Sequence, residues 1–345
     1  MLTIQKQLHP ASPAALMATG IFLIGTFAQF PTIDNTVGTV FAILLSLTGI
    51  AVYGQLLRQL AQPAFRKQLL GNPMNPFLFG TWIAGASMLC LVMLKYFPGF
   101  LVFARCFTVL LLCCWGAYLL LVLSCFKKLL MRPKNLLIHG VVLLAAVATQ
   151  SMVILVSHTF SPLPSWFLQI WIGCGMLLYA IGLLLIICAF HLHKTWNLVH
   201  DWKNTNCIIH GGLSITGLAM LTTNAFSSQF ILCCWCLATL LLILIEMVEV
   251  WRGLLRFIKF GLQRGLLTYD TTQWSRNFTF GMFFAFSHAM LLQIDDSVSV
   301  YVTIIIEQFL SVWTYVVLFL LILELYLAFR SHFQSKNTSS QKSRA

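Results

Sequence analysis

The sequence predicts an all-α polytopic membrane protein whose ten transmembrane helices form five helical hairpins. Of its 345 residues, 59% are hydrophobic and only 9% are charged, and the mean hydropathy is +0.87. Runs of about 20 apolar residues, each long enough to cross a bilayer core of roughly 30 Å, recur along almost the whole chain. This composition excludes a soluble globular enzyme and leaves no room for a sizeable extramembrane domain.

Hydropathy windows of about 19 residues define the spans. They predict helices at 11–30, 36–59, 76–94, 98–124, 137–157, 164–190, 208–227, 230–251, 275–293 and 298–329. Residues 1–330 are therefore predicted to form a single transmembrane domain. Residues 331–345 are basic and polar, and we expect a disordered cytoplasmic tail there. Residues 1–30 lack the pattern of a cleaved signal peptide.

The distribution of basic residues predicts the orientation. Nineteen of the 21 Lys and Arg residues fall in one set of alternate loops and at the termini, whereas the opposite loops hold only Lys95. The remaining one, Arg105, lies inside the fourth span. By the positive-inside rule both termini are cytoplasmic, in the inner membrane of the cell. The net charge of +12 is thus explained by topology, and we expect no binding to nucleic acid.

The spans repeat in pairs. The odd-numbered spans begin at about 11, 76, 137, 208 and 275, and Ile-His-Gly occurs at both 138–140 and 209–211. Cys-Cys-Trp likewise occurs at 113–115 and 233–235, in two even spans. A regular spacing of this kind indicates an internal repeat. It predicts a quasi-five-fold arrangement of hairpins.

Odd and even spans differ in composition. The odd spans are rich in small and neutral polar residues, which predicts that they lie inside and line a central pore, while the Leu-rich even spans lie outside. The pore-lining candidates are Gly20, Gly80, Gly140, Gly211, Gly281, Thr19, Thr81 and Ser214. For the glycines, close helix packing is an equally open interpretation, because small residues let helices approach in membranes.

The predicted wall suits weakly bound anions. It offers hydroxyl groups and no charge, and positive loops at the cytoplasmic mouth raise the local anion concentration. No Lys or Arg is predicted in the interior of an odd span, so small inorganic anions are favoured over dicarboxylates.

Three motifs resemble a known family. They are PAALMATGI at 13–21, NPFLFGTW at 75–82 and WSRNFTFG at 274–281. In their order and spacing these motifs resemble the tellurite-resistance/dicarboxylate transporter family, which includes plant guard-cell slow anion channels and bacterial tellurite-resistance membrane proteins. The resemblance implies a homotrimer in which each subunit holds its own pore, lined by the five odd helices and gated by a phenylalanine of the ninth. Carried onto this sequence, the gate is Phe280, with Phe278 as the nearest substitute. Gly281 stands where many relatives have proline.

Several ionisable residues invite a role. Arg105 and Glu307 lie at matching depths in even spans and are predicted to form a structural ion pair, within or between subunits. Glu246 and Glu249 are expected to form an interfacial charge network with nearby arginines. His139 and His210 are placed at the pore mouth, where they could titrate near neutrality. Interfacial hydrogen bonding is an equally open interpretation of both. His288 is a candidate for proton coupling.

The predicted function is an anion channel or exporter, similar to a voltage-dependent anion channel, that conducts small anions across the lipid bilayer. A proton-coupled carrier for dicarboxylate, sulfite or tellurite-type anions stays open as an alternative. A haem-binding membrane redox protein and a structural scaffold are more remote alternatives. The sequence shows no nucleophile motif, phosphate loop or zinc spacing, so we predict no enzymatic activity, no metal site and no cofactor.

Overall fold

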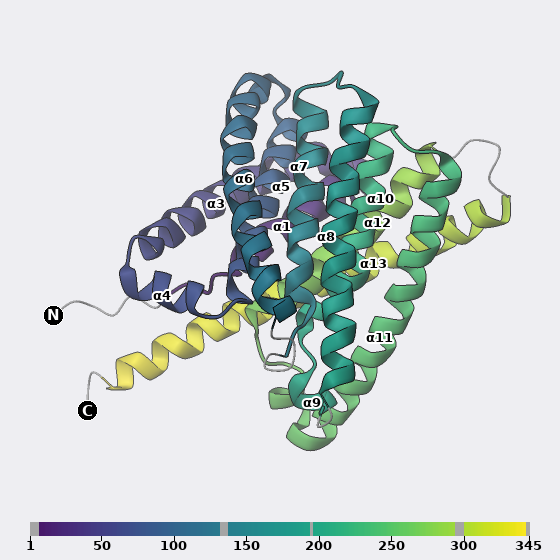
Figure 1. The fold of residues 1–345 in the computed structure, drawn as a ribbon. Helices are drawn as coiled ribbons and strands as arrows, with labels where there is room; N and C mark the ends of the chain where they lie inside the picture. The colour runs from purple at the N-terminus through teal and green to yellow at the C-terminus, as the bar shows by residue number, and fades with distance from the viewer. Residues whose placement is uncertain (1–6, 132–136, 194–195, 294–299, 343–345) are drawn as a thin grey trace.

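The computed structural model describes residues 7–131, 137–193, 196–293 and 300–342, and every regular element within these ranges is a helix (Figure 1). Seven helical stretches in this part of the chain are long and apolar enough to cross a membrane. A shorter apolar stretch covers Pro13–Gln29. The prediction of an all-helical, multi-pass membrane protein is thereby confirmed at the level of helix type, length and composition.

Five helices contact one another in a closed ring. α1 packs against α5, α5 against α7, α7 against α10, α10 against α12, and α12 again against α1. We call these five the ring helices. Their bounds are α1 Pro13–Ile24, α5 Phe79–Tyr96, α7 Leu144–Thr159, α10 Ile208–Thr223 and α12 Trp274–Gln293.

The ring helices all run in the same direction. A short 3₁₀ turn precedes four of them: η3 (Asn75–Leu78), η6 (Gly140–Leu143), η7 (Asn204–Cys207) and η8 (Thr271–Gln273). η3 contacts η6, η6 contacts η7, η7 contacts η8, and η8 contacts α1. The N-termini of the five ring helices therefore gather at one end, which we call the mouth.

Five further helices cover the ring, and we call them the outer helices. α3 packs on α1 and α5, α6 on α5 and α7, α8 on α7 and α10, α11 on α10 and α12, and α13 on α12 and α1. Their bounds are α3 Thr39–Leu60, α6 Leu101–Met131, α8 Ser165–Leu192, α11 Ser228–Gly265 and α13 Val300–Lys342.

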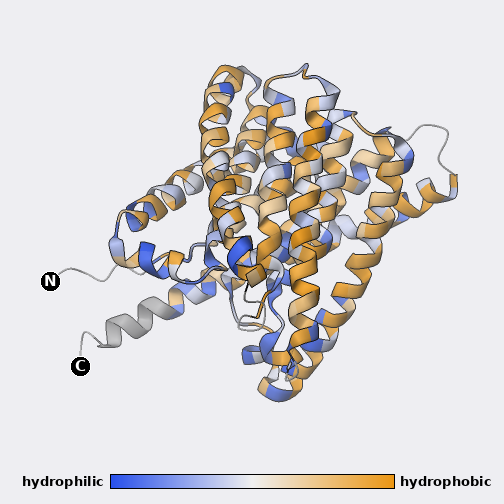
Figure 2. Cartoon of the chain, in the orientation of Figure 1, coloured by the Kyte–Doolittle hydropathy of each residue, from blue (hydrophilic) through white to orange (hydrophobic). Residues whose placement is uncertain are grey.

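Burial distinguishes the two sets of helices. The most apolar window of Gly140–Thr159, which contains α7, is 94% buried, whereas the corresponding window of Pro98–Met131, which contains α6, is 22% buried. Apolar side chains such as Leu120 and Ile243 project from the outer helices, and Figure 2 shows hydrophobic residues along most of their length. An apolar outward face fits a helix that meets lipid.

Helix boundaries depart from the predicted spans mainly on the mouth side. The short helices α4 (Pro63–Gly71) and α9 (Leu198–Asp201) were not predicted. α11 extends to Gly265, with a break at Gly261, where the positive φ of 71° suits glycine. α13 continues to Lys342, beyond the predicted end of the tenth span at residue 329. Hydropathy windows do not detect the polar and charged residues after 330 as a span, although such residues are compatible with a helix outside the membrane.

The repeated glycines lie where neighbouring ring segments touch. A Cβ at each of these glycines would meet the next segment of the ring within 3.0 Å or overlap it. The contacts are Gly20 with Met88 of α5, Gly80 with Leu144 of α7, Gly140 with Thr205 of η7, Gly211 with Thr279 of α12, and Gly281 with Ile21 of α1. The packing interpretation of these five glycines is thus the one that the contacts support.

Aromatic side chains of the outer helices donate hydrogen bonds to ring helices. Trp115 Nε1 donates to Thr149 Oγ1 of α7 at 3.2 Å, and Trp235 Nε1 donates to Ser287 Oγ of α12 at 2.9 Å. These two tryptophans belong to the repeated Cys-Cys-Trp motif. Tyr179 of α8 makes a similar bond to the backbone of α10. In a membrane such interhelical bonds contribute roughly 0.6–2 kcal/mol each. The repeated Cys-Cys-Trp motif therefore joins an outer helix to a ring helix.

We predict that Gly281→Ala lowers the free energy of unfolding by about 1–3 kcal/mol, because the new methyl group would lie 2.8 Å from Ile21. Gly173→Ala in α8 is the matched control, since its Cβ would meet nothing within 4 Å. Helix propensity should make that variant neutral or more stable by about 0.5–1 kcal/mol. Thermal unfolding in detergent measures both, and equal melting temperatures for the two variants would contradict the packing role.

Candidate functional site

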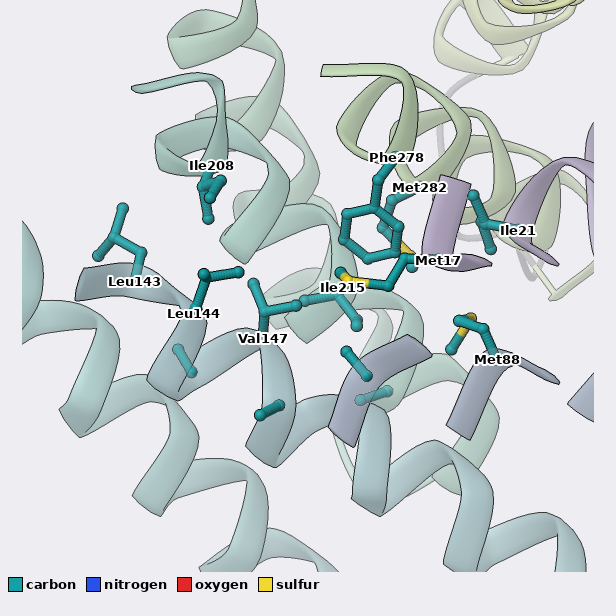
Figure 3. Packing of buried hydrophobic residues seen from close by; sticks show 14 of the residues in the cluster. Met17, Ile21, Met88, Leu143, Leu144, Val147, Ile208, Ile215, Phe278 and Met282 are labelled. Atoms are coloured by element: carbon teal, nitrogen blue, oxygen red, sulfur yellow. The ribbon is translucent and has the colours of Figure 1, made fainter. Parts of the chain in front are cut away.

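Side chains from all five ring helices gather in one apolar cluster inside the ring (Figure 3). We call the labelled members of this cluster, other than Leu143, the apolar plug: Met17 and Ile21 of α1, Met88 of α5, Leu144 and Val147 of α7, Ile208 and Ile215 of α10, and Phe278 and Met282 of α12. None is more than 2% exposed. Buried apolar side chains of all five ring helices thus pack together in this cluster.

The two gate candidates lie on different faces of α12. Phe278 and Met282 are one helical turn apart and share the face that joins the plug. Phe280 is turned away from them, and its ring lies 6.0 Å from that of His210 and 4.9 Å from that of Trp313, on the outer helix α13. Phe278 therefore joins the apolar plug, whereas Phe280 lies between α12 and the residues His210 and Trp313.

The hydroxyl groups expected to line the passage are already engaged. Each donates its single O–H to a backbone carbonyl of its own turn or helix: Thr19 to Ala15 at 2.9 Å, Thr81 to Leu78 at 2.7 Å, and Ser214 to His210 at 2.9 Å. A hydroxyl that donates to its own helix has no second proton for an anion. In this conformation these three side chains satisfy the helix and offer no donor to a passage.

Four charged residues form a network at the mouth end of α11 and α12. Arg276 of α12 pairs with two carboxylates of α11, at 2.5 Å from Nη2 to Oε1 of Glu249 and 3.7 Å from Nε to Oε1 of Glu246. Arg252 lies 3.3 Å from Oε2 of Glu249, and Trp202 Nε1 donates to Oε1 of that carboxylate at 2.8 Å. Two arginines and two glutamates thus offset one another.

Arg276 was counted with the basic residues of the cytoplasmic side, although it falls at the start of the predicted span 275–293. It is the third residue of α12, so a ring helix does carry a basic residue. The sequence places Arg276 at the start of a span, but only the tertiary contact with Glu246 and Glu249 shows that it is paired. Because the pairing neutralises it, the mouth end of α12 still presents no free positive charge to an anion.

His210 lies at the inner end of this network. Its side chain is fully buried, and neither ring nitrogen has a hydrogen-bond partner. Nε2 of His210 is 4.0 Å from Oε1 of Glu246. The centroid of the His210 imidazole lies 6.0 Å from that of the Phe280 phenyl group. The structure therefore places His210 behind the mouth, between a ring helix and the outer helices.

His139 links two turns of the mouth. Its Nδ1 lies 2.8 Å from Oγ1 of Thr205 in η7. Burial, with a smaller contribution from the positive charge of Lys203, lowers the pKa of His139 from 6.5 to about 4. A lowered pKa favours the neutral form of His139, and the contact with Thr205 fits the interpretation of His139 as a hydrogen-bonding residue.

The remaining ionisable candidates are distant from the plug. His288 stacks on Phe284 at 6.0 Å, one turn away on α12. Arg105 is exposed on α6 and donates from Nε to the carbonyl oxygen of Thr159 at 2.9 Å. Glu307 is exposed on α13. Because α6 covers α5 and α7 while α13 covers α12 and α1, the predicted ion pair within one subunit is not formed.

No protein-family model matches this chain, and no curated protein matches its sequence. Within the described residues, no group of three or more His, Cys, Asp or Glu side chains lies close enough to hold a metal ion.

We predict that stability falls as the pH drops from about 6.5 towards 4. The unfolded chain takes up a proton at His139 below its ordinary pKa, whereas the folded chain does so only near pH 4. The contribution is fully present above pH 6.5 and amounts to roughly 2 kcal/mol for this partly exposed side chain. His139→Gln should flatten the pH dependence of the melting temperature over this interval, and an unchanged slope would contradict the assignment.

Proposed function

We propose that the chain forms a gated passage for small anions across the inner membrane, with the ten ring and outer helices as ten crossings in five hairpins. The observation that supports this most is the closed ring of five helices running in one direction around an apolar plug. In this proposal both termini and the mouth face the cytoplasm, and the protein is a transporter and not an enzyme.

Helix direction favours anions at the mouth. Each helix N-terminus carries a partial charge of roughly +0.5 from its unsatisfied N–H groups. Five such termini gather at the mouth, and the loops on that side hold most of the basic residues. Together they raise the local concentration of anions and disfavour cations.

The plug has the properties of a hydrophobic gate. A narrow apolar constriction resists wetting and stops ions until it widens. Three of its members, Met17, Met88 and Met282, have flexible unbranched side chains that repack with little strain. Phe278 supplies the largest side chain. Movement of Phe278 with these methionines would open the passage.

The charge distribution favours weakly held substrates. Arg276 is paired with Glu246 and Glu249, so it is not free to hold both carboxylates of a dicarboxylate. Rapid passage requires binding that is weak enough for release. We therefore propose small inorganic anions as the substrates.

We predict that Phe278→Ala raises chloride flux into liposomes by at least about tenfold, because it removes the largest side chain of the constriction. Phe280→Ala is the matched control on the same helix, and we expect it to change flux much less, since that ring packs against Trp313. A larger increase for Phe280→Ala would return the gate to that residue. Flux that requires a pH gradient in every variant would favour the coupled carrier.

Assembly as a homotrimer is proposed from the family resemblance, and two exposed charges support contacts between subunits. Arg105 and Glu307 project from outer helices on different sides of the ring. A charge exposed to lipid is costly and is normally paired. In an oligomer with rotational symmetry, α6 of one subunit can meet α13 of the next, and these two residues would then form an ion pair.

We predict that Arg105→Glu weakens the oligomer and that Arg105→Glu with Glu307→Arg restores it. Reversing one charge places two carboxylates together, whereas reversing both recreates the pair. Mass measurement by light scattering in detergent distinguishes these states. Failure of the double variant to recover the mass of the wild-type oligomer would contradict pairing between subunits.

A further inference from the structure

Glu324 is a buried carboxyl group within an apolar stripe. The side of α13 that packs on the ring carries Val317, Leu321 and Leu327, at the spacing of one helical face, and Glu324 lies among them. Its side chain is only 5% exposed, and Oε1 has no hydrogen-bond partner. No ion pair to Glu324 is formed by the residues that the structure describes. A carboxyl group in this position needs a physical explanation.

The charges around Glu324 do not neutralise it. α13 packs on α12, α1 and η1 (Thr26–Gln29), and α1 and η1 contain no titratable residue. From α12 the charged group in its electrostatic environment is Arg276, and from the segment before α12 it is Asp270. On α13 itself, Tyr326 and Arg330 follow on other faces of the helix.

Neither of these neighbours is available as a partner. Arg276 is already paired with Glu246 and Glu249. Asp270 carries the same charge as an ionised Glu324, and its carboxylate caps η8 by accepting a hydrogen bond from the backbone N–H of Thr272 at 2.8 Å. His9 is the further titratable group near Asp270. An ionised Glu324 would therefore be buried, unpaired and repelled.

An unpaired charge in a low-dielectric site costs several kcal/mol, whereas a protonated carboxyl group is neutral. We propose that Glu324 is a proton-binding site that makes anion flux depend on cytoplasmic pH, with flux highest when the carboxyl group is protonated. This inference rests on the proposed anion passage. Its ligand is a single proton, exchanged with water on the mouth side.

Loss of the proton would act on the mouth in two ways. It would place a negative charge near the N-terminus of α12, opposing the positive potential of the ring helices there. It would also add a third carboxylate to the surroundings of Arg276, in competition with Glu246 and Glu249. Both effects reduce the local concentration of anions at the mouth.

Glu324→Gln tests the proposal because glutamine mimics the protonated acid and does not titrate. Chloride flux would be measured in liposomes at several pH values on the mouth side. We expect flux through the wild-type protein to fall as pH rises, by at most about tenfold per pH unit for one proton. Flux through Glu324→Gln should stay at the acidic wild-type level. Tyr326→Phe, an exposed position on the same turn, is the control and should keep the wild-type profile.

Infrared spectroscopy gives a readout that does not need transport. The wild-type protein should show the carbonyl stretch of a protonated carboxylic acid that disappears in Glu324→Gln and in alkaline buffer, and Glu324→Asp should retain a titrating band. A wild-type pH profile in Glu324→Gln, or the same band in both proteins, would overturn the proton site. Absence of chloride flux in all variants with the band present would overturn the proposed function and leave the proton site standing.

Discussion

The close approach of neighbouring ring segments at glycine is the constraint on which the rest of the structure depends. Five parallel helices can close into a ring only if each contact is short, and Gly20, Gly80, Gly211 and Gly281 each face a neighbouring ring helix. Parallel helix dipoles repel one another, so the arrangement also needs the outer helices. Each outer helix follows its ring helix in sequence and contacts two ring helices that neighbour each other.

Charged side chains near the ring helices are constrained as well. A bilayer does not solvate isolated ions, so basic and acidic side chains near the ring are paired, as Arg276 is with Glu246 and Glu249. In the proposed function, the ring would attract anions through backbone termini and distant loops instead of through a binding residue. Glu324, which has no ion pair, and the His210 imidazole, which has no hydrogen-bond partner, depart from this rule. Both lie between the ring helices and the outer helices, so movement of the ring helices against the outer helices would change their surroundings.

Sequence reasoning worked where the signal was local and failed where it depended on contacts. Apolar length predicts helices because each span meets lipid independently of the others. Phe278 and Phe280 could not be distinguished in this way, because they lie on the same helix and differ only in the direction of their side chains. Their neighbours are known only from the assembled fold: Met282 for Phe278 and Trp313 for Phe280. The pairing of Arg276 escaped detection for the same reason.

The amino-acid sequence by itself determined that the chain is helical and apolar, that its elements repeat, and that small residues recur at equivalent points of the repeat. These properties follow from composition and spacing, which act locally. Only the tertiary structure decided what the small residues do, which phenylalanine enters the ring, and which charges lack a partner. Those outcomes depend on distances between segments far apart in the chain, because packing, hydrogen bonding and ion pairing act only over a few ångströms.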